Sequence, residues 1–395
     1  MSISDVVIVD GVRTAIGGFG GSLSTLTPAE LGTAAAAEVI KRTGVDPQNI
    51  DHSVFGHIIT TGPQDVYLSR HIALNVGMAT SSAALNVNRL CGSSVQSVIS
   101  AAQMVALGDS KMALAGGAES MSQGAYILPG ARTGFRMGDS NVVDMTVSIL
   151  SDPFGSGHMG ITAENISQQY GLTRQDLDEY SAESHRRAAA AIANGHFEGQ
   201  IVPVTVKKGR KEFVFSQDEH VRADTTVESL SGLRPAFKKD GIVTPGNASG
   251  INDGGAAMLL TTAAEAEKQG LKARARILSY GFSGVNPDVM GLGPTPAVKS
   301  AMQKAGLSVA DMDVIESNEA FAAQAIAVSR DLDFDPAKVN PNGGAVGLGH
   351  PVGATGSILI IKTLAELDRI EGRYGLITMC IGGGQGIALV VERMA

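Results

Sequence analysis

The feature that most constrains the fold is a likeness between the two ends of the chain. Residues 44–57 (GVDPQNIDHSVFGH) align without gaps with residues 306–319 (GLSVADMDVIESNE) at a shift of 262, and Ser94–Ala118 aligns with Ser357–Ile381 at a shift of 263. In both copies a glycine-rich turn leads into an apolar helix and then a strand. Chance similarity between two α/β segments is the alternative, but two stretches that agree on nearly one shift favour a duplicated domain.

Short β-branched runs alternate with longer helix-like segments, which is typical of an α/β fold. We predict strands at residues 6–10, 112–118 and 377–380, and helices at Ala29–Lys41, Ser94–Leu107 and Ser357–Asp368. Residues 122–250 interrupt this alternation with polar helix formers and charged turns, and we interpret them as an inserted loop or cap domain. The predicted domains are an N-terminal half (1–121 plus about 251–272), the insert (122–250) and a C-terminal half (273–395).

The composition argues against several classes of protein. A net charge of −8 argues against general nucleic-acid binding, which needs a basic surface. No apolar run approaches the roughly 20 residues of a membrane span, so we expect no membrane partner. The opening MSISDVVIVD shows no signal peptide. We therefore expect a cytoplasmic protein, although a mature organellar protein that had lost its transit peptide would look the same.

Cys91 is the first candidate catalytic residue. It stands where the apolar run NVNRL meets Cys-Gly-Ser-Ser and then an amphipathic helix. The positive end of a helix favours an anion, so we expect the pKa of this thiol to be lowered. The small residues Gly92 and Ser93 would let a substrate carbonyl approach backbone N–H groups. A buried structural cysteine is an equally good interpretation of this segment alone.

His350 lies in the glycine-rich run NPNGGAVGLGHPVGATG. Gly349 and Gly353 would let the imidazole project from a sharp turn into a cavity, where it could act as a general base beside a cysteine. A pyrophosphate-binding glycine loop is the competing interpretation. Because the spacing lacks the third glycine of the dinucleotide fingerprint, that signal is weak.

Cys380 ends an apolar strand and is followed by Gly382, Gly383 and Gly384. We expect its thiol to be exposed at a tight turn. Two cysteines at corresponding ends of duplicated halves could face one another across a shared site, one as the nucleophile and the other as an acid/base. A redox pair is the alternative, but the sequence contains no C-x-x-C motif.

Asn318 follows the strand-like run DVIES and precedes a helical segment. Such an asparagine is most often an N-cap, and the functional alternative is a residue that orients a water or an oxyanion. His158, in SGHMGITAEN, likewise lies at a helix entry. The remaining histidines have no metal-ligand spacing and no P-loop occurs, so we expect neither a metal ion nor a nucleoside triphosphate.

Six motifs occur in order along the chain: VNRLCGSS, GGAES, GHMGITAEN, NEAFA, NPNGGAVGLGHPVGATG and CIGGGQG. Over essentially the whole chain they resemble the thiolase family, and within it the biosynthetic acetyl-CoA acetyltransferases. Six ordered motifs are far more specific than any one of them. The chain departs from the family pattern with CGSS for CGSG, HPVGATG for HPIGASG, and Pro245 where alanine is frequent.

The resemblance implies a role for each catalytic residue. Cys91 would be the acylated nucleophile, His350 would activate it, and Cys380 would move the α-proton of a second acetyl group. Asn318 corresponds to the residue that holds a catalytic water and, with His350, forms one oxyanion hole. The backbone N–H groups of Cys91 and Gly382 would form the second.

The resemblance also implies that coenzyme A and acetyl-CoA are substrates and that no cofactor is permanently bound. The stretch SGLRPAFKKDGIVTPGNASGINDG resembles the coenzyme-binding part of the insert. Ser249 would contact the pantetheine, Phe237 would line its tunnel, and Arg222 would lie near the adenine. The residues that match pocket positions near the thioester or in the apolar lining are His158, Met159, Met290 and Phe321.

The fold implied is the thiolase fold, in which two similar βαβαβαββ halves form five layers, α-β-α-β-α, with an inserted loop domain. The activity implied is that of an acetyl-CoA C-acetyltransferase, a reversible Claisen condensation of two acetyl-CoA to acetoacetyl-CoA and coenzyme A through an acyl-cysteine. The alternatives are a degradative 3-ketoacyl-CoA thiolase of broader or dicarboxylic specificity and a non-catalytic acyl-CoA binding protein. Residues 124–139 resemble the loop through which thiolases assemble, so we expect a homotetramer, a dimer of dimers.

Overall fold

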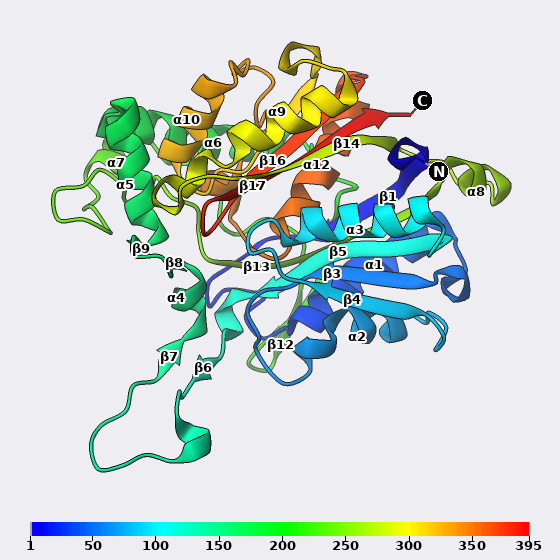
Figure 1. The fold of residues 1–395 in the computed structure, drawn as a ribbon, viewed down its shortest axis with the longest axis horizontal. Helices are drawn as coiled ribbons and strands as arrows, with labels where there is room; N and C mark the ends of the chain where they lie inside the picture. Colours follow the sequence, from blue (N-terminus) through cyan, green and yellow to red (C-terminus); the bar gives the residue numbers. More distant parts are fainter. Residues whose placement is uncertain (1, 395) are drawn as a thin grey trace.

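The computed structural model describes residues 2–394, and two α/β halves form its body (Figure 1). The N-terminal half has the order βαβαβαββ: β1 (Val6–Thr14), α1 (Pro28–Thr43), β3 (His52–Gly56), α2 (Leu68–Asn75), β4 (Ala83–Val87), α3 (Ser93–Leu107), β5 (Met112–Ser120) and β13 (Asn252–Thr262). The C-terminal half contains β14 (Ala275–Gly284), α9 (Pro294–Ala305), β15 (Val314–Ser317), α10 (Ala322–Asp331), α12 (Thr355–Ile370), β16 (Tyr374–Ile381) and β17 (Gln385–Arg393). Its counterpart of β4 is reduced to an isolated bridge between Val339 and Ile315. All six helices and strands predicted from the sequence lie at these places.

One sheet runs through both halves, in the order β15-β16-β17-β14-β1-β13-β5-β3-β4. The halves are joined where β1 pairs antiparallel with β14, with Val7 opposite Arg276 and Ile8 opposite Ala275. In each half the two crossover connections give parallel pairs, β3 with β4 and β5, and β15 with β16. The last strand of each half is antiparallel to its neighbours. A short turn joins β16 to β17, whereas the whole insert lies between β5 and β13.

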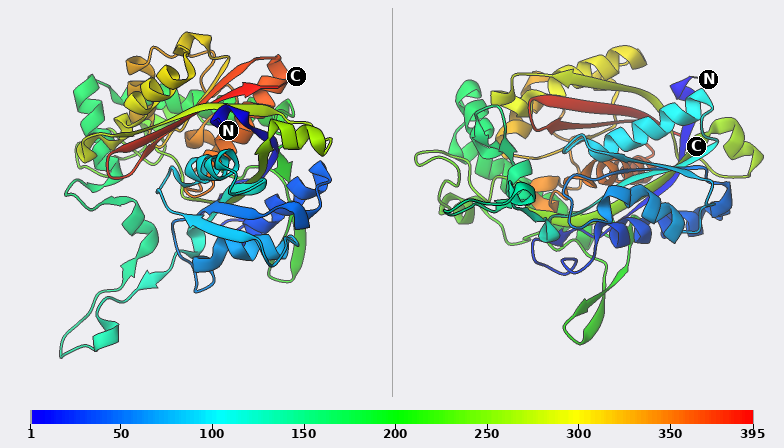
Figure 2. Two further views of the ribbon diagram at one scale, coloured as in Figure 1. Left: turned by 45° about the vertical axis from the view of Figure 1, so that its right-hand side comes forward. Right: turned by 60° about the horizontal axis from the view of Figure 1, so that its bottom comes forward.

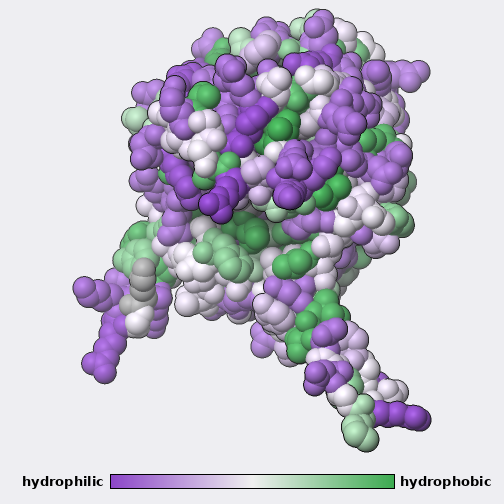
Figure 3. All heavy atoms as spheres, turned by 90° about the vertical axis from the view of Figure 1, so that its left-hand side faces the viewer, coloured by the Kyte–Doolittle hydropathy of each residue, from purple (hydrophilic) through white to green (hydrophobic). Residues whose placement is uncertain are grey.

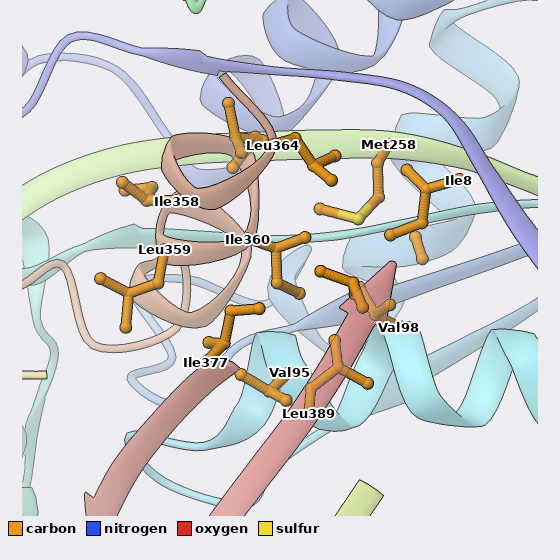
Figure 4. Packing of buried hydrophobic residues seen from close by; sticks show 14 of the residues in the cluster. Ile8, Val95, Val98, Met258, Ile358, Leu359, Ile360, Leu364, Ile377 and Leu389 are labelled. Atoms are coloured by element: carbon orange, nitrogen blue, oxygen red, sulfur yellow. The ribbon is translucent and has the colours of Figure 1, made fainter. Parts of the chain in front are cut away.

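The helices and strands of the two halves form five layers, which pack together through three apolar clusters. Helices α1 and α2 cover the outer face of the N-terminal strands, and α9 and α10 cover the outer face of the C-terminal strands. Between the two sets of strands lie α3 and α12, whose side chains pack against both. Figure 4 shows this central layer, with Val95 and Val98 of α3 and Ile360 of α12 between Ile8 of β1 and Leu389 of β17. The predicted α-β-α-β-α arrangement is confirmed.

The two central helices meet at positions that the sequence alignment makes equivalent. The backbone N–H of Ser357 in α12 donates to Ser94 Oγ in α3 at 2.9 Å. Gly356 lies so close to α3 that a Cβ there would come within 2.7 Å of the Val95 backbone nitrogen. The helix N-termini of the two copies therefore lie together at the centre of the molecule.

The segment between β5 and β13 contributes helices on one side of the body and two projecting hairpins (Figures 1 and 2). Its helices are α4 (Met145–Ile149), α5 (Met159–Tyr170), α6 (Arg174–Ala193) and α7 (Val227–Ser231). Its short strands are β6 (Tyr126–Ile127), β7 (Val143–Asp144), β8 (Ser151–Asp152), β9 (Gly157–His158), β10 (Ile201–Val202), β11 (Val204–Lys208) and β12 (Lys211–Phe215). The predicted limits of the insert, 122 and 250, fall just after β5 and just before β13.

A strand pairing and a buried ion pair attach the insert to the N-terminal half. Strand β10 pairs in parallel with the end of β1, where Arg13 lies opposite Ile201. The Arg13 guanidinium forms a fully buried ion pair with Asp218, at 2.7 Å. Removing either partner would leave an uncompensated buried charge, so this contact fixes the insert on the body.

One stretch, Leu90–Leu107, has the length and apolar composition of a membrane span, but 61% of it is buried within the protein. It comprises α3 and the turn before it. Its apolar character follows from its place between the two sets of strands.

Candidate active site

A cavity of about 470 Å³ lies where the insert covers the ends of both halves. Residues from distant parts of the chain line it, including Cys91, His350 and Gly382. All seven predicted substrate-binding residues also line it: His158, Met159, Arg222, Phe237, Ser249, Met290 and Phe321. The face that carries α4, α5 and β9 is hollowed, and apolar side chains are visible in the depression (Figure 3). Asn318 and Cys380 are the two predicted residues that lie behind the cavity wall.

Cys91 sits in a constrained turn between β4 and α3. Gly92 is the N-cap of α3, so the thiol lies just before the helix, as predicted. Leu90 has a φ of +45°, a left-handed conformation that is uncommon for a branched residue. Ser93 holds the turn, because its Oγ donates to Leu90 O at 2.6 Å and accepts from Arg89 N at 2.9 Å.

The predicted lowering of the Cys91 pKa is wrong. Burial raises the pKa of this thiol to about 11, and the nearby Glu119 carboxylate adds to the increase. The backbone N–H groups of Gly382 and of Cys91 itself point at the sulfur and oppose the shift, but they are outweighed. Sequence periodicity locates a helix N-terminus, whereas the loss of solvent depends on the whole fold. The free thiol is therefore neutral near pH 7, and two backbone donors converge on it.

His350 is a buried, neutral imidazole with an assigned tautomer. Its Nδ1 lies 2.7 Å from Thr355 Oγ1, which itself donates to Pro351 O at 2.9 Å. Thr355 Oγ1 must then accept a hydrogen bond from the Nδ1–H group, which leaves Nε2 unprotonated and able to act as a base. Burial lowers the pKa of His350 to about 4. Gly349, at φ +104°, makes the turn possible, since a Cβ there would meet the Asn252 amide that holds the His350 N–H.

Asn318 supports this imidazole from behind the cavity wall. Its Nδ2 lies 3.5 Å from His350 Nε2. Its Oδ1 is buried and has no hydrogen-bond partner among residues 2–394. The N-cap of α10 is Phe321, so capping does not explain Asn318. An unpaired buried acceptor beside a base is suited to hold a water or a substrate group.

Cys380 is not exposed at a turn, contrary to the prediction. It is 0% exposed in an apolar cluster with Met159, Met290 and Phe321. Burial raises its thiol pKa, and the nearby Cys91 raises it further, so the two sulfur atoms lie in one environment. The cysteines do not occupy corresponding positions either. At a shift of 263, Cys380 matches Gly117, where a Cβ would come within 1.9 Å of Gly353 O.

The aromatic wall of the cavity comes from the insert and α10. The His158 ring stacks on Phe237 with centroids 4.4 Å apart, and Phe237 meets Phe321 edge to face at 6.3 Å. His158 also caps α5, since its Nδ1 accepts from Gly160 N at 3.0 Å. Ser249 is held close to Phe321 because its N–H donates to Ala320 O at 3.0 Å. Arg222 is exposed and supplies a positive charge at the cavity.

Sequence reasoning missed several lining residues. They are Ile58, Leu90, Met121, Ile149, Leu150, His220, Ala320 and Val352. Most are apolar and have no local signature, and His220 lies in a charged stretch with no motif. The remaining lining residues belong to the stretch 231–254 that the sequence predicted to bind the coenzyme: Ala236, Pro245, Ala248, Gly250 and Ile251. A second cavity, of about 520 Å³, lies between α6 and α10 and is lined by none of the predicted site residues.

Glu319, next to Asn318, has a structural role that its motif did not reveal. Its Oε2 accepts from Ser184 Oγ at 2.6 Å and from Val346 N at 3.1 Å, and its Oε1 accepts from Asn340 Nδ2 at 2.9 Å. This carboxylate therefore ties α6 to the loop that leads to His350.

Known proteins are similar to this chain in both sequence and fold. Residues 6–264 match the family model "Thiolase, N-terminal domain", and residues 271–393 match "Thiolase, C-terminal domain". The beta-ketothiolase BktB of Cupriavidus necator is 55% identical over 99% of both chains. An acetyl-CoA acetyltransferase of Pseudomonas aeruginosa is 46% identical over 99% of this chain and 100% of its own.

Two solved structures superpose closely. The acetyl-CoA acetyltransferase of Bacillus anthracis has a TM-score of 0.96 at 44% identity, with 98% of each chain covered. Human mitochondrial 3-ketoacyl-CoA thiolase in complex with CoA has a TM-score of 0.95 at 40% identity, also with 98% of each chain covered. Family models cover both halves and the relatives extend over nearly the whole length, so this chain belongs to the thiolase family.

Proposed function

We propose that the protein is an acetyl-CoA C-acetyltransferase, which reversibly condenses two acetyl-CoA into acetoacetyl-CoA and coenzyme A. The observation that carries the proposal is the set of Cys91, His350 and Gly382 on one apolar cavity, with Cys380 directly behind its wall. The relatives named acetyl-CoA acetyltransferase support it. The mechanism uses no metal ion and no permanently bound cofactor; coenzyme A is a substrate.

In the first half-reaction, Cys91 Sγ attacks the acetyl-CoA carbonyl while His350 Nε2 takes the thiol proton. The free groups are both neutral, so this proton moves during the attack and not before it. The N–H groups of Cys91 and Gly382 receive the oxyanion of the tetrahedral intermediate. The intermediate collapses to acetyl-Cys91. The departing coenzyme A sulfur takes the proton of the neutral Cys380 thiol, which leaves a Cys380 thiolate, while His350 keeps the proton that it took from Cys91.

In the second half-reaction, the Cys380 thiolate removes an α-proton from a second acetyl-CoA. Asn318, through a water on its free Oδ1, and His350 stabilise the enolate oxygen. The carbanion attacks acetyl-Cys91, a carbon–carbon bond forms, and the Cys91–acyl bond breaks. The Cys91 sulfur then takes back the proton held by His350, and Cys380 keeps the α-proton, so both thiols and the imidazole return to their neutral starting state.

The cavity supports binding of an acyl-CoA. Ser249 lines the cavity, and its backbone N–H donates to Ala320 O. We propose that Ser249 contacts the amides of the pantetheine. Phe237 and His158 offer a flat apolar wall to the thioester end, and exposed Arg222 offers a charge to the nucleotide end. Met290 lines the cavity and packs in one apolar cluster with Cys380 and Phe321. We propose that it limits the acyl pocket to a short chain.

A broader 3-ketoacyl-CoA thiolase is the second candidate. The observation that favours it is the 55% identity to a protein named beta-ketothiolase, compared with 46% to the P. aeruginosa acetyl-CoA acetyltransferase. Both candidates use the same residues and differ only in the space that the acyl chain occupies.

Acetyl-CoA labelled in the acetyl group tests the mechanism. Mass spectrometry should find the label on Cys91 in the wild type and in the Cys380→Ser variant. The Cys91→Ser variant should carry no label. Cys380→Ser should form acetyl-enzyme but condense at least about 1000-fold more slowly, since the α-proton has no acceptor. A non-catalytic binder would leave Cys91 unlabelled, and that result would refute both enzymatic candidates.

Thiolysis rates against 3-ketoacyl-CoA of increasing length separate the two candidates. If the acyl pocket is short, kcat/KM should fall about tenfold or more from the four-carbon to the eight-carbon substrate. Comparable rates for both lengths would overturn the acetyl preference and favour the broader thiolase.

We further propose a cytoplasmic homotetramer, a dimer of dimers. Between β6 and β7 the chain forms an arm that projects from the body, and large apolar side chains are exposed on it. They include Tyr126 at 65%, Phe135 at 50% and Met137 at 103% exposure. Exposed apolar patches of this kind mark interaction surfaces, which supports assembly through this arm.

A further inference from the structure

A buried ionic cluster lies in the N-terminal half, outside the residues that the proposed mechanism uses. His57 Nδ1 lies 3.0 Å from Glu119 Oε1 and 3.1 Å from Ala118 O. Its Nε2 has no hydrogen-bond partner among residues 2–394 and lies at ion-pair distance, 3.5 Å, from Asp65 Oδ2. The three side chains are 5%, 0% and 4% exposed, respectively. Burial alone would lower the pKa of His57, but Glu119 and Asp65 raise it to about 10. The ring is therefore a buried cation at neutral pH, held between two carboxylates.

Glu119 connects this cluster to the walls around Cys91. At the end of β5, its two oxygens accept from the backbone N–H groups of Ile58 and Ile59, each at 3.1 Å. Ile58 lines the cavity, and Ile59 belongs to a small apolar cluster against which Cys91 packs. The same carboxylate thus fixes the backbone of one segment that encloses the sulfur.

Glu119 also touches the loop that carries His350. A Cβ at Gly353 would come within 2.4 Å of Glu119 Oε2, so the carboxylate lies directly against that loop. Val352, the neighbour of Gly353, belongs to the same apolar cluster around Cys91. One buried carboxylate therefore accepts hydrogen bonds from one of the loops that flank the nucleophile and packs directly against the other.

The negative charge of Glu119 opposes the proposed reaction at Cys91. A fixed negative charge beside Cys91 disfavours the thiolate that forms during attack. The other titratable groups that face it give no relief: Cys380 and His350 are neutral, and Asp253 on β13 lies close enough to Glu119 for the two carboxylates to interact. His57, on the far side of Glu119, is placed to cancel that charge.

We propose that Glu119 is a positioning residue for the two loops around Cys91, and that the protonated ring of His57, oriented by Asp65, neutralises Glu119 so that the thiolate can form. None of the three lines the cavity, so they act through Cys91 and do not touch substrate. The inference deepens the proposed function and rests on it, since it matters only if Cys91 is the nucleophile.

The rate of Cys91 alkylation by iodoacetamide at about pH 8 tests this inference without turnover, because His57 is protonated at that pH and the rate follows the thiolate fraction. The full-length protein is used without substrate, and mass spectrometry assigns the modified residue. Glu119→Gln removes the negative charge and should raise the alkylation rate about tenfold. His57→Gln leaves Glu119 uncompensated and should lower the rate about tenfold or more. The double variant, which is neutral at both positions, should return close to the wild-type rate.

Glu316→Gln is the matched control. Glu316 is an equally buried carboxylate in the C-terminal half, paired with Lys362 Nζ at 2.7 Å, and it has no contact with Cys91. Its loss should reduce stability and leave the alkylation rate at about pH 8 unchanged. If His57→Gln does not fold, Glu119→Gln and the double variant carry the test, because neither leaves Glu119 charged.

Opposite changes of the alkylation rate in the two single variants support the inference. Rates equal to that of the wild type, or changes in the same direction, overturn it and reduce the cluster to a structural role. Failure of the proposed function is a separate result: if the variants show opposite rate changes but the wild-type protein forms no acetyl-Cys91, the function is refuted and the electrostatic coupling stands.

Discussion

In the free protein, Cys91 and His350 line the cavity as neutral groups, since burial raises the pKa of the thiol to about 11 and lowers that of the imidazole to about 4. The free protein therefore contains no preformed Cys91 thiolate. The N–H groups at Gly382 and Cys91 stabilise negative charge only when it develops, which is the condition for accelerating a reaction step. The tautomer of His350 then becomes decisive, because Nε2 must be free to accept the proton.

Thr355→Val tests this assignment at the residue scale. The change removes the oxygen that accepts from His350 Nδ1 and keeps the side-chain shape. We expect the rate of Cys91 acetylation, measured by rapid quench, to fall about 10- to 100-fold, the value of one hydrogen bond to a group that becomes charged.

Thr363→Val is the control in the same helix. Thr363 is also buried and donates to the carbonyl four residues earlier, Leu359 O, at 2.9 Å, as Thr355 does to Pro351 O. It has no contact with His350, so acetylation should stay within about twofold of wild type. Equal losses in both variants would show that packing, and not the tautomer, is what Thr355 supplies.

At the scale of elements, the site depends on how closely the N-termini of α3 and α12 approach. Cys91 lies just before α3, and His350 lies just before α12. The contact between Ser94 and Ser357 fixes these two helix starts, and hence the two catalytic groups, relative to each other. A side chain at Gly356 would separate them.

Gly356→Ala should therefore reduce stability and activity together. Its Cβ would come within 2.7 Å of backbone in α3, which cannot yield without moving the helix. We expect a loss of about 2 kcal/mol or more in the free energy of unfolding, measured by denaturant titration, with a clear loss of kcat.

Gly32→Ala, in α1, is the matched substitution. There the nearest atom is the flexible end of the Ile72 side chain, at 2.4 Å, and alanine gains about 1 kcal/mol of helix propensity. We expect Gly32→Ala to be much milder and to leave kcat unchanged. Similar losses in the two variants would contradict a special role for the α3–α12 contact.

On the scale of the whole molecule, two hairpins project from the body, and they differ in character (Figures 2 and 3). The arm between β6 and β7 bears exposed Phe135 and Met137, whereas the β11–β12 hairpin bears lysines and Glu212. An isolated chain that exposes such an arm gains by burying it against a copy of itself.

Phe135→Asp/Met137→Asp should convert the proposed tetramer into dimers. Both side chains are at least half exposed, so the subunit itself should remain folded. Light scattering after size exclusion measures the mass. The control is Val214→Asp, at a 63% exposed position on the other hairpin, which should leave the mass unchanged. A tetramer that persists in the arm variant would exclude assembly through this arm.

The sequence determined the elements and their pairing into two copies. Hydrophobic periodicity and glycine-rich turns are local properties, so the strands β1, β5 and β16 and the helices α1, α3 and α12 could be placed from residues alone. The ordered motifs around Cys91, His350 and Cys380 indicated the family, because each combines a reactive residue with the small neighbours that its turn requires.

Only the tertiary structure decided how those residues behave. The buried state of Cys380, the direction of the Cys91 pKa shift and the link from His57 through Glu119 to two loops all depend on the sum of distant neighbours. Desolvation is set by every chain segment that covers a group, and no local pattern encodes it. The same reason explains why the lining residues Ile58 and His220 could not be found from sequence: nothing in their own segments marks the side that faces the cavity.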